Sequence, residues 1–331
     1  MKQSRSLPRH LGSVIIVAVA ALLAYWLVGH RQQVLDQVFL WGYTPTADIS
    51  AIATRTTMTS QARTTFYASH PELDDATAFN KACGKSEQGA AVLGCYTGLK
   101  IYIYNVTDAQ LDGIHEVTAA HEMLHAAYAR MSTSEKQQVD TLLEQEYATL
   151  SKDPAFADRM ALYARTEPGE RDNELHSIIG TEVASISPEL EKHYAQYFTD
   201  RQAVVKLHDA YASVFTKLQT EAAQLSDQMT QLEAAIKTRS SSYESASEQL
   251  NADISAFNQR ASSGQFDSSS QFDSERAALV ARVRQLGAER AAINDMIVRY
   301  NELVKQSNAI ATQTEQLNQS INSNLAPAPS L

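Results

Sequence analysis

The sequence predicts an α+β fold with three parts: an N-terminal transmembrane helix, a small domain of a short sheet plus helices, and a C-terminal antiparallel coiled-coil hairpin. Three observations predict this arrangement. Residues 11–29 form an apolar run without a charge, residues 47–199 contain short strand-like stretches followed by helical ones, and from about residue 200 apolar residues recur every seven positions. The composition also changes near residue 203, from Tyr, Phe and aliphatic residues to Ala, Gln, Ser, Leu, Glu and Asn.

The N-terminal part has the pattern of a membrane anchor. Residues 1–10 are basic, and residues 11–29 are sufficient to cross about 30 Å of hydrocarbon as a helix. Positive charge before the apolar run predicts a cytoplasmic N-terminus and an extracytoplasmic location for the rest of the chain. A cleaved signal peptide is the alternative, but its apolar core has only about 7 to 15 residues. We therefore expect a single-pass protein of the cell membrane, with residues 30–46 as a juxtamembrane segment.

The chain contains two cysteines, Cys83 and Cys95, and both fall in the part expected outside the cytoplasm. Such a pair predicts a disulfide, with two free thiols as the alternative. Closing so short a loop contributes about 2 to 3 kcal/mol in the chain-entropy model.

Residues 47–199 are expected to form the small domain. Short strands are predicted between about Ile49 and Tyr104, most clearly in "LKIYIYNV", where Ile and Tyr alternate. Pro188 follows Ser187, which is typical of a helix start with Ser as N-cap. Earlier helices are predicted at residues 113–131, 134–151, 154–165 and 168–185.

Residues 200–322 are predicted to form the coiled-coil hairpin, and residues 323–331 a disordered tail. The polar stretch "ASSGQFDSSSQFDS" separates two arms with heptad patterns. Arg239 and Arg290 fall at expected core positions, which indicates register control or a face for a coiled-coil partner or self-association. The expected core residues are Ala222, Met229, Ile236, Tyr243, Leu250 and Phe257 in the first arm, and Leu279, Val283, Leu286, Ile293, Ile297, Tyr300 and Val304 in the second.

The net charge of −10 and the pI near 5.4 argue against a nucleic-acid partner. Phosphate binding requires a concentrated basic surface, and no such cluster occurs in the sequence.

The motif "HEMLH" at residues 121–125 is the clearest sign of chemistry. His121 and His125 are one turn apart on a predicted helix, so both imidazoles can reach one metal ion. Glu122 projects about 100° further round the helix, which suits a general base acting on metal-activated water. The motif therefore predicts a Zn²⁺ site, although cobalt or manganese also suits these ligands.

A catalytic zinc requires a third protein ligand, and "RDNELHSIIGTE" offers candidates. The segment resembles the Asn-Glu-x-x-Ser pattern of the glutamate zincins (gluzincins) at Asn173, Glu174 and Ser177. The resemblance covers residues 110–185 and implies a zincin-like metallopeptidase domain at 47–199, with His121, His125 and Glu174 as metal ligands and Glu122 as base. Ile178 replaces the acidic residue that often closes the family pattern.

Two alternative third ligands are Glu182 and His176. Zincins use a His or Tyr to stabilise the oxyanion, and His193, Tyr194 and Tyr197 are the candidates here. Zincins also place an extended substrate along an edge strand, and the strand ending in "IYIYN" is a candidate for that role, with core packing as the simpler interpretation.

We therefore expect a membrane-anchored zinc metallopeptidase that hydrolyses peptide bonds of a peptide or protein substrate on the extracytoplasmic side. The alternative is a coiled-coil envelope scaffold or partner-binding protein with a structural or inactive zinc fold. A third hypothesis is a zinc hydrolase that cleaves a non-peptide bond of the envelope.

Overall fold

The computed structural model describes residues 19–20, 31–83, 92–166 and 169–324. The chain divides into two compact units. The first, here called the globular unit, comprises Met1–Val214 and Asn318–Leu331, and the second, the hairpin unit, comprises Phe215–Leu317.

The predicted α+β class is wrong, because the described chain is mostly α-helical with a single small sheet. The helices of the globular unit before the hairpin are α2 (Arg31–Leu40), α3 (Ala47–Arg55), α4 (Ser60–Ala68), α5 (Ala76–Cys83), α6 (Ile114–Arg130), α7 (Thr133–Leu150), α8 (Pro154–Thr166), α9 (Arg171–Glu182) and α10 (Pro188–Tyr194), with a short 3-10 helix at Ala109–Leu111.

The stretch that misled the prediction is rich in threonine and forms α3 and α4 instead of strands. Thr46 and Thr59 cap these helices, each accepting a hydrogen bond from a backbone N–H three residues later. Inside them, Thr54 and Thr64 donate to the carbonyl oxygens four residues earlier, each at 2.9 Å. Such bonds satisfy the hydroxyl within a helix, so β-branched threonine does not enforce a strand here.

The sheet has the strand order β1-β3-β2, with β1 (Glu72–Asp74) parallel and β2 (Gly94–Tyr96) antiparallel to β3 (Ile101–Tyr104). The alternation predicted for "IYIY" is confirmed, since Ile101 and Ile103 are buried and the two tyrosines are half-buried. Because β3 is the central strand, the candidate edge for a substrate is β2 and not the Tyr-rich strand.

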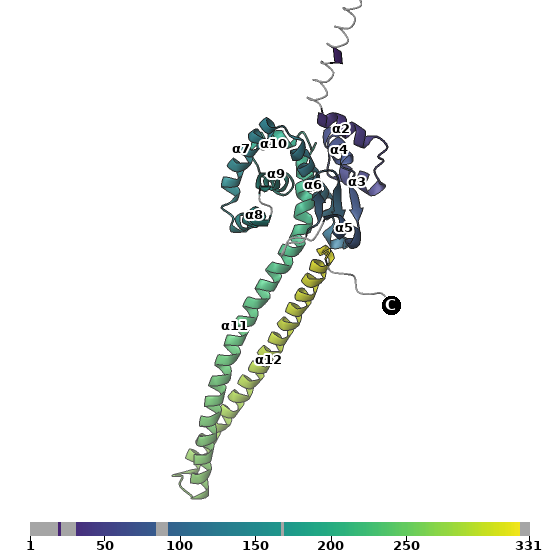
Figure 1. The fold of residues 1–331 in the computed structure, drawn as a ribbon. Helices are drawn as coiled ribbons and strands as arrows, with labels where there is room; N and C mark the ends of the chain where they lie inside the picture. Colours follow the sequence, from purple (N-terminus) through teal and green to yellow (C-terminus); the bar gives the residue numbers. More distant parts are fainter. Residues whose placement is uncertain (1–18, 21–30, 84–91, 167–168, 325–331) are drawn as a thin grey trace, which may run out of the picture. The chain divides into compact units, whose positions relative to one another are not determined.

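Helix α6 occupies the middle of the globular unit and packs against α9, α3, α4, β2 and β3. In Figure 1 it lies between α7 to α10 on one side and the sheet with α2 to α5 on the other. Nearly every residue from Glu116 to Tyr128 is buried, which explains its run of alanines. The helices predicted at 113–131, 134–151, 154–165 and 168–185 are confirmed within a few residues, as is Ser187 as the N-cap of α10.

The predicted single-pass membrane location is not supported. None of the helices in the described part of the chain is long and apolar enough to cross a bilayer. Apart from residues 19 and 20, the predicted anchor at 11–29 lies outside the described residues.

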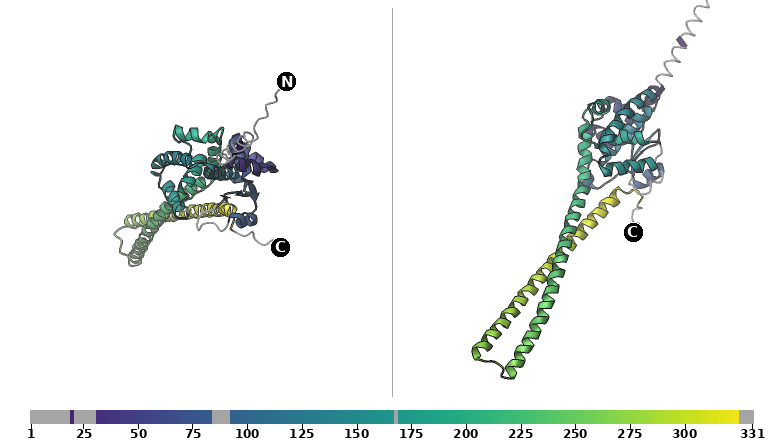
Figure 2. Two further views of the ribbon diagram at one scale, coloured as in Figure 1. Left: turned by 45° about the horizontal axis from the view of Figure 1, so that its top comes forward. Right: turned by 90° about the vertical axis from the view of Figure 1, so that its left-hand side faces the viewer.

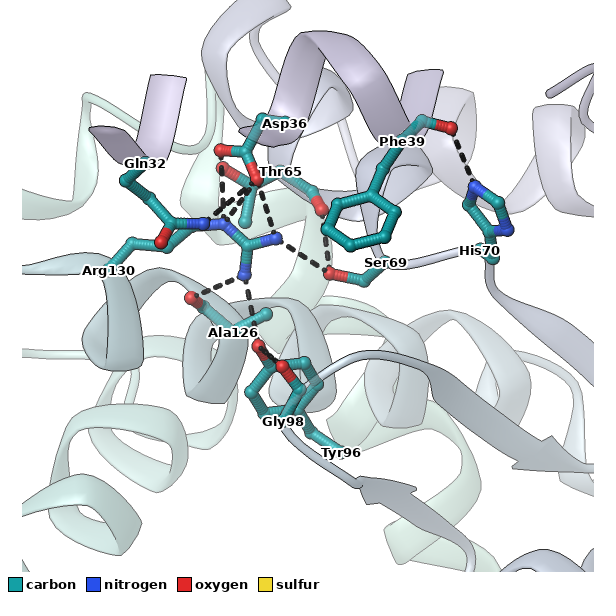
Figure 3. Close-up of polar contacts among 10 residues, drawn as sticks. All are labelled: Gln32, Asp36, Phe39, Thr65, Ser69, His70, Tyr96, Gly98, Ala126 and Arg130. Carbon is teal, nitrogen blue, oxygen red and sulfur yellow. Dashed lines mark hydrogen bonds and ion pairs between the residues drawn. The ribbon is translucent and has the colours of Figure 1, made fainter. Parts of the chain in front are cut away.

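A buried ion pair fixes the C-terminal end of α6 (Figure 3). Arg130 donates through Nη2 to Asp36 of α2 at 2.9 Å, and its Nη1 donates to the Ala126 carbonyl at 2.9 Å and to the Tyr96 hydroxyl of β2 at 3.2 Å. Nη2 also donates to Ser69 Oγ, at 3.3 Å. One guanidinium therefore joins α2, α4, α6 and β2.

The predicted disulfide is confirmed, and it links Cys83 at the end of α5 to Cys95 in the middle of β2.

The hairpin unit consists of most of α11 (Arg201–Ser262) and α12 (Ser269–Ile321), joined by residues 263–268, and both views in Figure 2 show the two arms and their turn. Leu250, Phe257 and Ile293 are buried as predicted, but Val283 and Ile297 are 50% and 40% exposed and do not belong to the core. Arg290 is exposed as well, whereas Arg239 pairs with Glu289 of the other arm. The inter-arm ion pairs are Arg239 with Glu289, Arg282 with Asp253, and Arg260 with Glu275.

Candidate metal centre

Helices α6 and α9 bring the two motif histidines and the predicted glutamate together. His121 and His125 lie on one face of α6, with ring centroids 4.7 Å apart. Glu174 projects from the first turn of α9, the helix that packs most extensively on α6. In the part of the chain that the structure describes, His121, His125 and Glu174 form the group whose ligand atoms can hold a metal ion, all within 4.8 Å of one another.

The separations suit a single ion. Glu174 Oε2 lies 3.6 Å from His121 Nε2, and Glu174 Oε1 lies 3.3 Å from His125 Nε2. Ligand atoms around one tetrahedral ion with bonds of about 2.0 to 2.2 Å are about 3.4 Å apart. Two imidazole nitrogens and one carboxylate oxygen are also a donor set that zinc accepts. The three residues therefore fit a divalent metal.

The side chains of the three ligands differ in exposure. His121 is 18% exposed, against 10% for His125 and 6% for Glu174. His121 is therefore the ligand most accessible to solvent.

Burial and charge act differently on the two histidines. Burial lowers the pKa of His121, but the hydrogen bond and charge of Glu174 outweigh it and raise the pKa to about 9. Burial together with the positive charge of His121 lowers the pKa of His125 to about 4. The raised pKa means that His121 holds a proton at neutral pH, which a bound cation would replace.

Glu122 is buried on α6 between the two ligand turns and faces strand β2. Gly94 makes this approach feasible, because a Cβ at that position would lie 2.7 Å from Glu122 Oε1 and 2.6 Å from Thr118 Cγ2. The absence of a side chain at position 94 lets the strand backbone lie directly over the carboxylate. The sequence contained no specific sign of this role, since Gly94 resembles the other loop glycines nearby.

Glu182 does not join the metal group. It lies two turns after Glu174 on α9, where its carboxylate accepts from Arg159 Nη1 at 2.7 Å and lies 3.5 Å from His208 Nε2. Glu182 therefore forms ion pairs with Arg159 and His208 and does not act as a metal ligand in this structure.

His176 also lies outside the metal group and pairs with His193. The side chain of His176 is fully buried, and its Nε2 is 2.9 Å from His193 Nε2, so one ring donates to the other. Tyr194 donates its hydroxyl to the His176 carbonyl at 2.7 Å, and the Tyr197 ring contacts both histidine rings. The candidates for oxyanion stabilisation, His193, Tyr194 and Tyr197, therefore form one aromatic cluster with His176 of α9. Within this cluster the Tyr194 hydroxyl already has a hydrogen-bond partner. Burial lowers the pKa of His193 to about 4.

The residues that carry the family resemblance have distinct surroundings. Asn173 donates through its amide to Glu170 at 2.9 Å, while Ser177 is fully buried and its Oγ makes no hydrogen bond with the described residues. Ile178, at the position of the missing acid, is part of the hydrophobic core.

Comparisons of the chain with models of protein families, with curated proteins and with solved structures gave no match. The chemistry of the centre itself is therefore the basis for a functional proposal.

Proposed function

We propose that this protein is a zinc-dependent metallopeptidase of the gluzincin type, with His121, His125 and Glu174 as ligands and Glu122 as general base. The convergence of the three ligands supports this proposal most strongly. Glu174 follows His125 by 49 positions, yet its carboxylate oxygens lie 3.6 Å from His121 Nε2 and 3.3 Å from His125 Nε2, distances suited to one ion. A buried glutamate directly after the first histidine then adds the group that peptide hydrolysis needs.

The roles of the residues follow from their positions. A bound zinc ion supplies a Lewis acid that polarises the scissile carbonyl and lowers the pKa of water. Glu122 takes the proton from the attacking water and later delivers it to the leaving amine. The backbone of Gly94 lies close against the Glu122 side chain and limits its movement. Such positioning of a base reduces the reorganisation needed during the reaction.

Strand β2 offers a docking edge for an extended peptide. Tyr104 N donates to Leu93 O, and Thr97 N donates to Lys100 O. Along β2 and its flanking residues Leu93 and Thr97, the backbone groups of every second residue, starting with Leu93, therefore point toward β3. By the antiparallel pattern, the N–H and C=O groups of Gly94 and Tyr96 then point away from β3. A substrate that pairs with these groups by β-augmentation runs past Glu122, since Gly94 lies over that carboxylate.

The test is cleavage of a mixed peptide library by the zinc-loaded chain, analysed by mass spectrometry. We expect cleavage that a chelator abolishes and that Glu122→Gln reduces by at least about 100-fold, within the usual contribution of a general base. Glu189→Gln, an exposed glutamate of α10, is the matched control and should retain activity.

Full zinc-dependent cleavage by the Glu122→Gln protein would contradict the proposed mechanism. A zinc-loaded chain that cleaves cell-wall fragments but no peptide would contradict the peptide substrate, and a chain that cleaves neither would favour the scaffold alternative.

A further inference from the structure

Helix α12 has apolar residues on two sides, about 120° apart around the helix. One side faces α11 and contains Leu279, Leu286 and Ile293, which are half-buried or buried. The other side is open to solvent, and there Val280 is 40% and Val298 is 67% exposed. Exposed large apolar side chains on a helix already packed on one side require a separate explanation.

Four exposed apolar or small residues of α12 lie along a narrow line, whereas the exposed Val283 and Ile297 lie about 60° and 100° away from it around the helix. Val280, Gly287, Ala291 and Val298 are spaced by seven, four and seven positions, and all four are exposed. At about 100° per residue they fall within about 40° of the helix circumference. We call these four residues the outer stripe. Spacings of seven and four are those of a helix that packs along another helix.

Gly287 gives an independent observation at the centre of the outer stripe. It is the single glycine of α12, and glycine inside a helix is less stable than alanine by about 0.5 to 1 kcal/mol. A Cβ at this position would meet nothing within 4 Å, so packing inside the chain does not require glycine. A second backbone that approaches closely at this point does require it.

The outer stripe and its flanking charges are symmetrical about position 289. Val280 and Val298 lie nine residues to either side, and Gly287 and Ala291 lie two residues to either side. Further out, Arg276 and Glu302 are each thirteen residues from the centre, and Asp273 and Lys305 are each sixteen. Each outer pair combines opposite charges, and all four of these residues are exposed.

We propose that the outer stripe is a homodimer interface, in which α12 helices of two copies pack antiparallel about a two-fold axis near position 289. In this pairing Val280 meets Val298 of the second copy, and Gly287 meets Ala291 of the second copy at the close central crossing. The two-fold axis repeats each contact. Arg276 then faces Glu302 of the second copy, and Asp273 faces Lys305 of the second copy.

The charges exclude a parallel arrangement in the same register. Two parallel helices would place every charged residue opposite its own copy, so Arg276 would face arginine and Asp273 would face aspartate, which is unfavourable. A foreign helix would need no internal symmetry of the stripe, so the symmetry favours a second copy as the occupant.

The test is sedimentation of the full chain over a range of concentrations. We expect a dimer whose dissociation constant rises at least tenfold in Val280→Glu and in Val298→Glu. Both side chains are exposed in the hairpin, so these variants should keep their helical content by circular dichroism. Ala281→Glu is the matched control, because this residue is exposed and lies about 100° from Val280 around the helix, and it should leave the dimer unchanged.

A charge exchange tests the antiparallel register. Arg276→Glu and Glu302→Arg should each weaken the dimer, and the double variant should recover most of the lost affinity, because the two charges then face each other with signs reversed. A monomer at every concentration, or a dimer that neither valine variant weakens, would overturn the proposal. Failure of the double variant to recover would overturn the antiparallel register.

Discussion

Replacing Arg130 with methionine should destabilise the globular unit by about 3 to 5 kcal/mol, the usual result of removing one partner from a buried ion pair. The side chains of Arg130 and Asp36 are only 13% and 10% exposed. The substitution leaves the Asp36 carboxylate buried, with the Gln32 amide at 3.1 Å as its remaining donor among the contacts in Figure 3. It also removes donors from the Tyr96 hydroxyl and the Ala126 carbonyl.

Most of this destabilisation should come from the Asp36 carboxylate, which remains buried without its ion-pair partner, and not from lost packing alone. The double variant Asp36→Leu, Arg130→Met removes both charges, and we expect its stability to fall within about 1 kcal/mol of the unmodified chain. Lys100→Met breaks the half-exposed pair with Glu72 and should lose less than about 1 kcal/mol.

Hydrogen exchange of α6 amides is the suitable assay, since it reports the opening free energy of the globular unit separately from that of the hairpin. A loss below about 1 kcal/mol in Arg130→Met, or a double variant that is as unstable as the single one, would contradict a stabilising role of the buried ion pair.

Three further predictions concern the base, the disulfide and the hairpin. Gly94→Ala should displace the Glu122 carboxylate and reduce peptide cleavage by about 100-fold or more while metal content stays constant, as kinetics and mass spectrometry would show; unchanged kinetics would contradict this. Cys83→Ser should lower the free energy of unfolding by about 2 to 3 kcal/mol in urea titrations, and an unchanged midpoint would contradict this role of the disulfide. Hydrogen bonds from arginine lower the pKa values of Asp253, Glu275 and Glu289 in the hairpin, so their stabilisation is present above the ordinary carboxyl values of 3.8 and 4.5 and is lost as the pH falls through the lowered ones. The melting temperature of the hairpin should therefore be constant between about pH 5 and 8 and should fall below about pH 4. A fall already at pH 6 would contradict this, because it would require a titrating group other than these carboxylates.

The parts predicted correctly from the sequence depend on local patterns. The alternation of "IYIY", the helix around "HEMLH" and the heptads of the hairpin each arise from one element and its own periodicity. The region of α3 and α4 was mispredicted because capping and hydroxyl bonds to the preceding turn override the strand preference of threonine. In α12, Val283 and Ile297 have the right spacing for a core but lie on its solvent side.

Part of the candidate metal centre could be predicted from the sequence, but the partners of several residues are defined only by the tertiary structure. The motif predicted His121, His125 and Glu122, and the family resemblance predicted Glu174. The assignment of Glu182 to Arg159, and of His176 to His193, depends on helices that meet only in the fold. The pair of Asp36 and Arg130, separated by 94 positions, has no local sequence pattern that would reveal it.

Metal content of the purified chain is the most direct test of the proposed zinc centre. Elemental mass spectrometry after chelator-free purification should find one zinc per chain, and His121→Ala and Glu174→Ala should each lose most of it. Glu182→Ala is the matched control on the same helix and should keep the metal, because that carboxylate pairs with Arg159. A chain without metal, or a metal content that Glu182→Ala lowers and Glu174→Ala does not, would contradict the proposed centre.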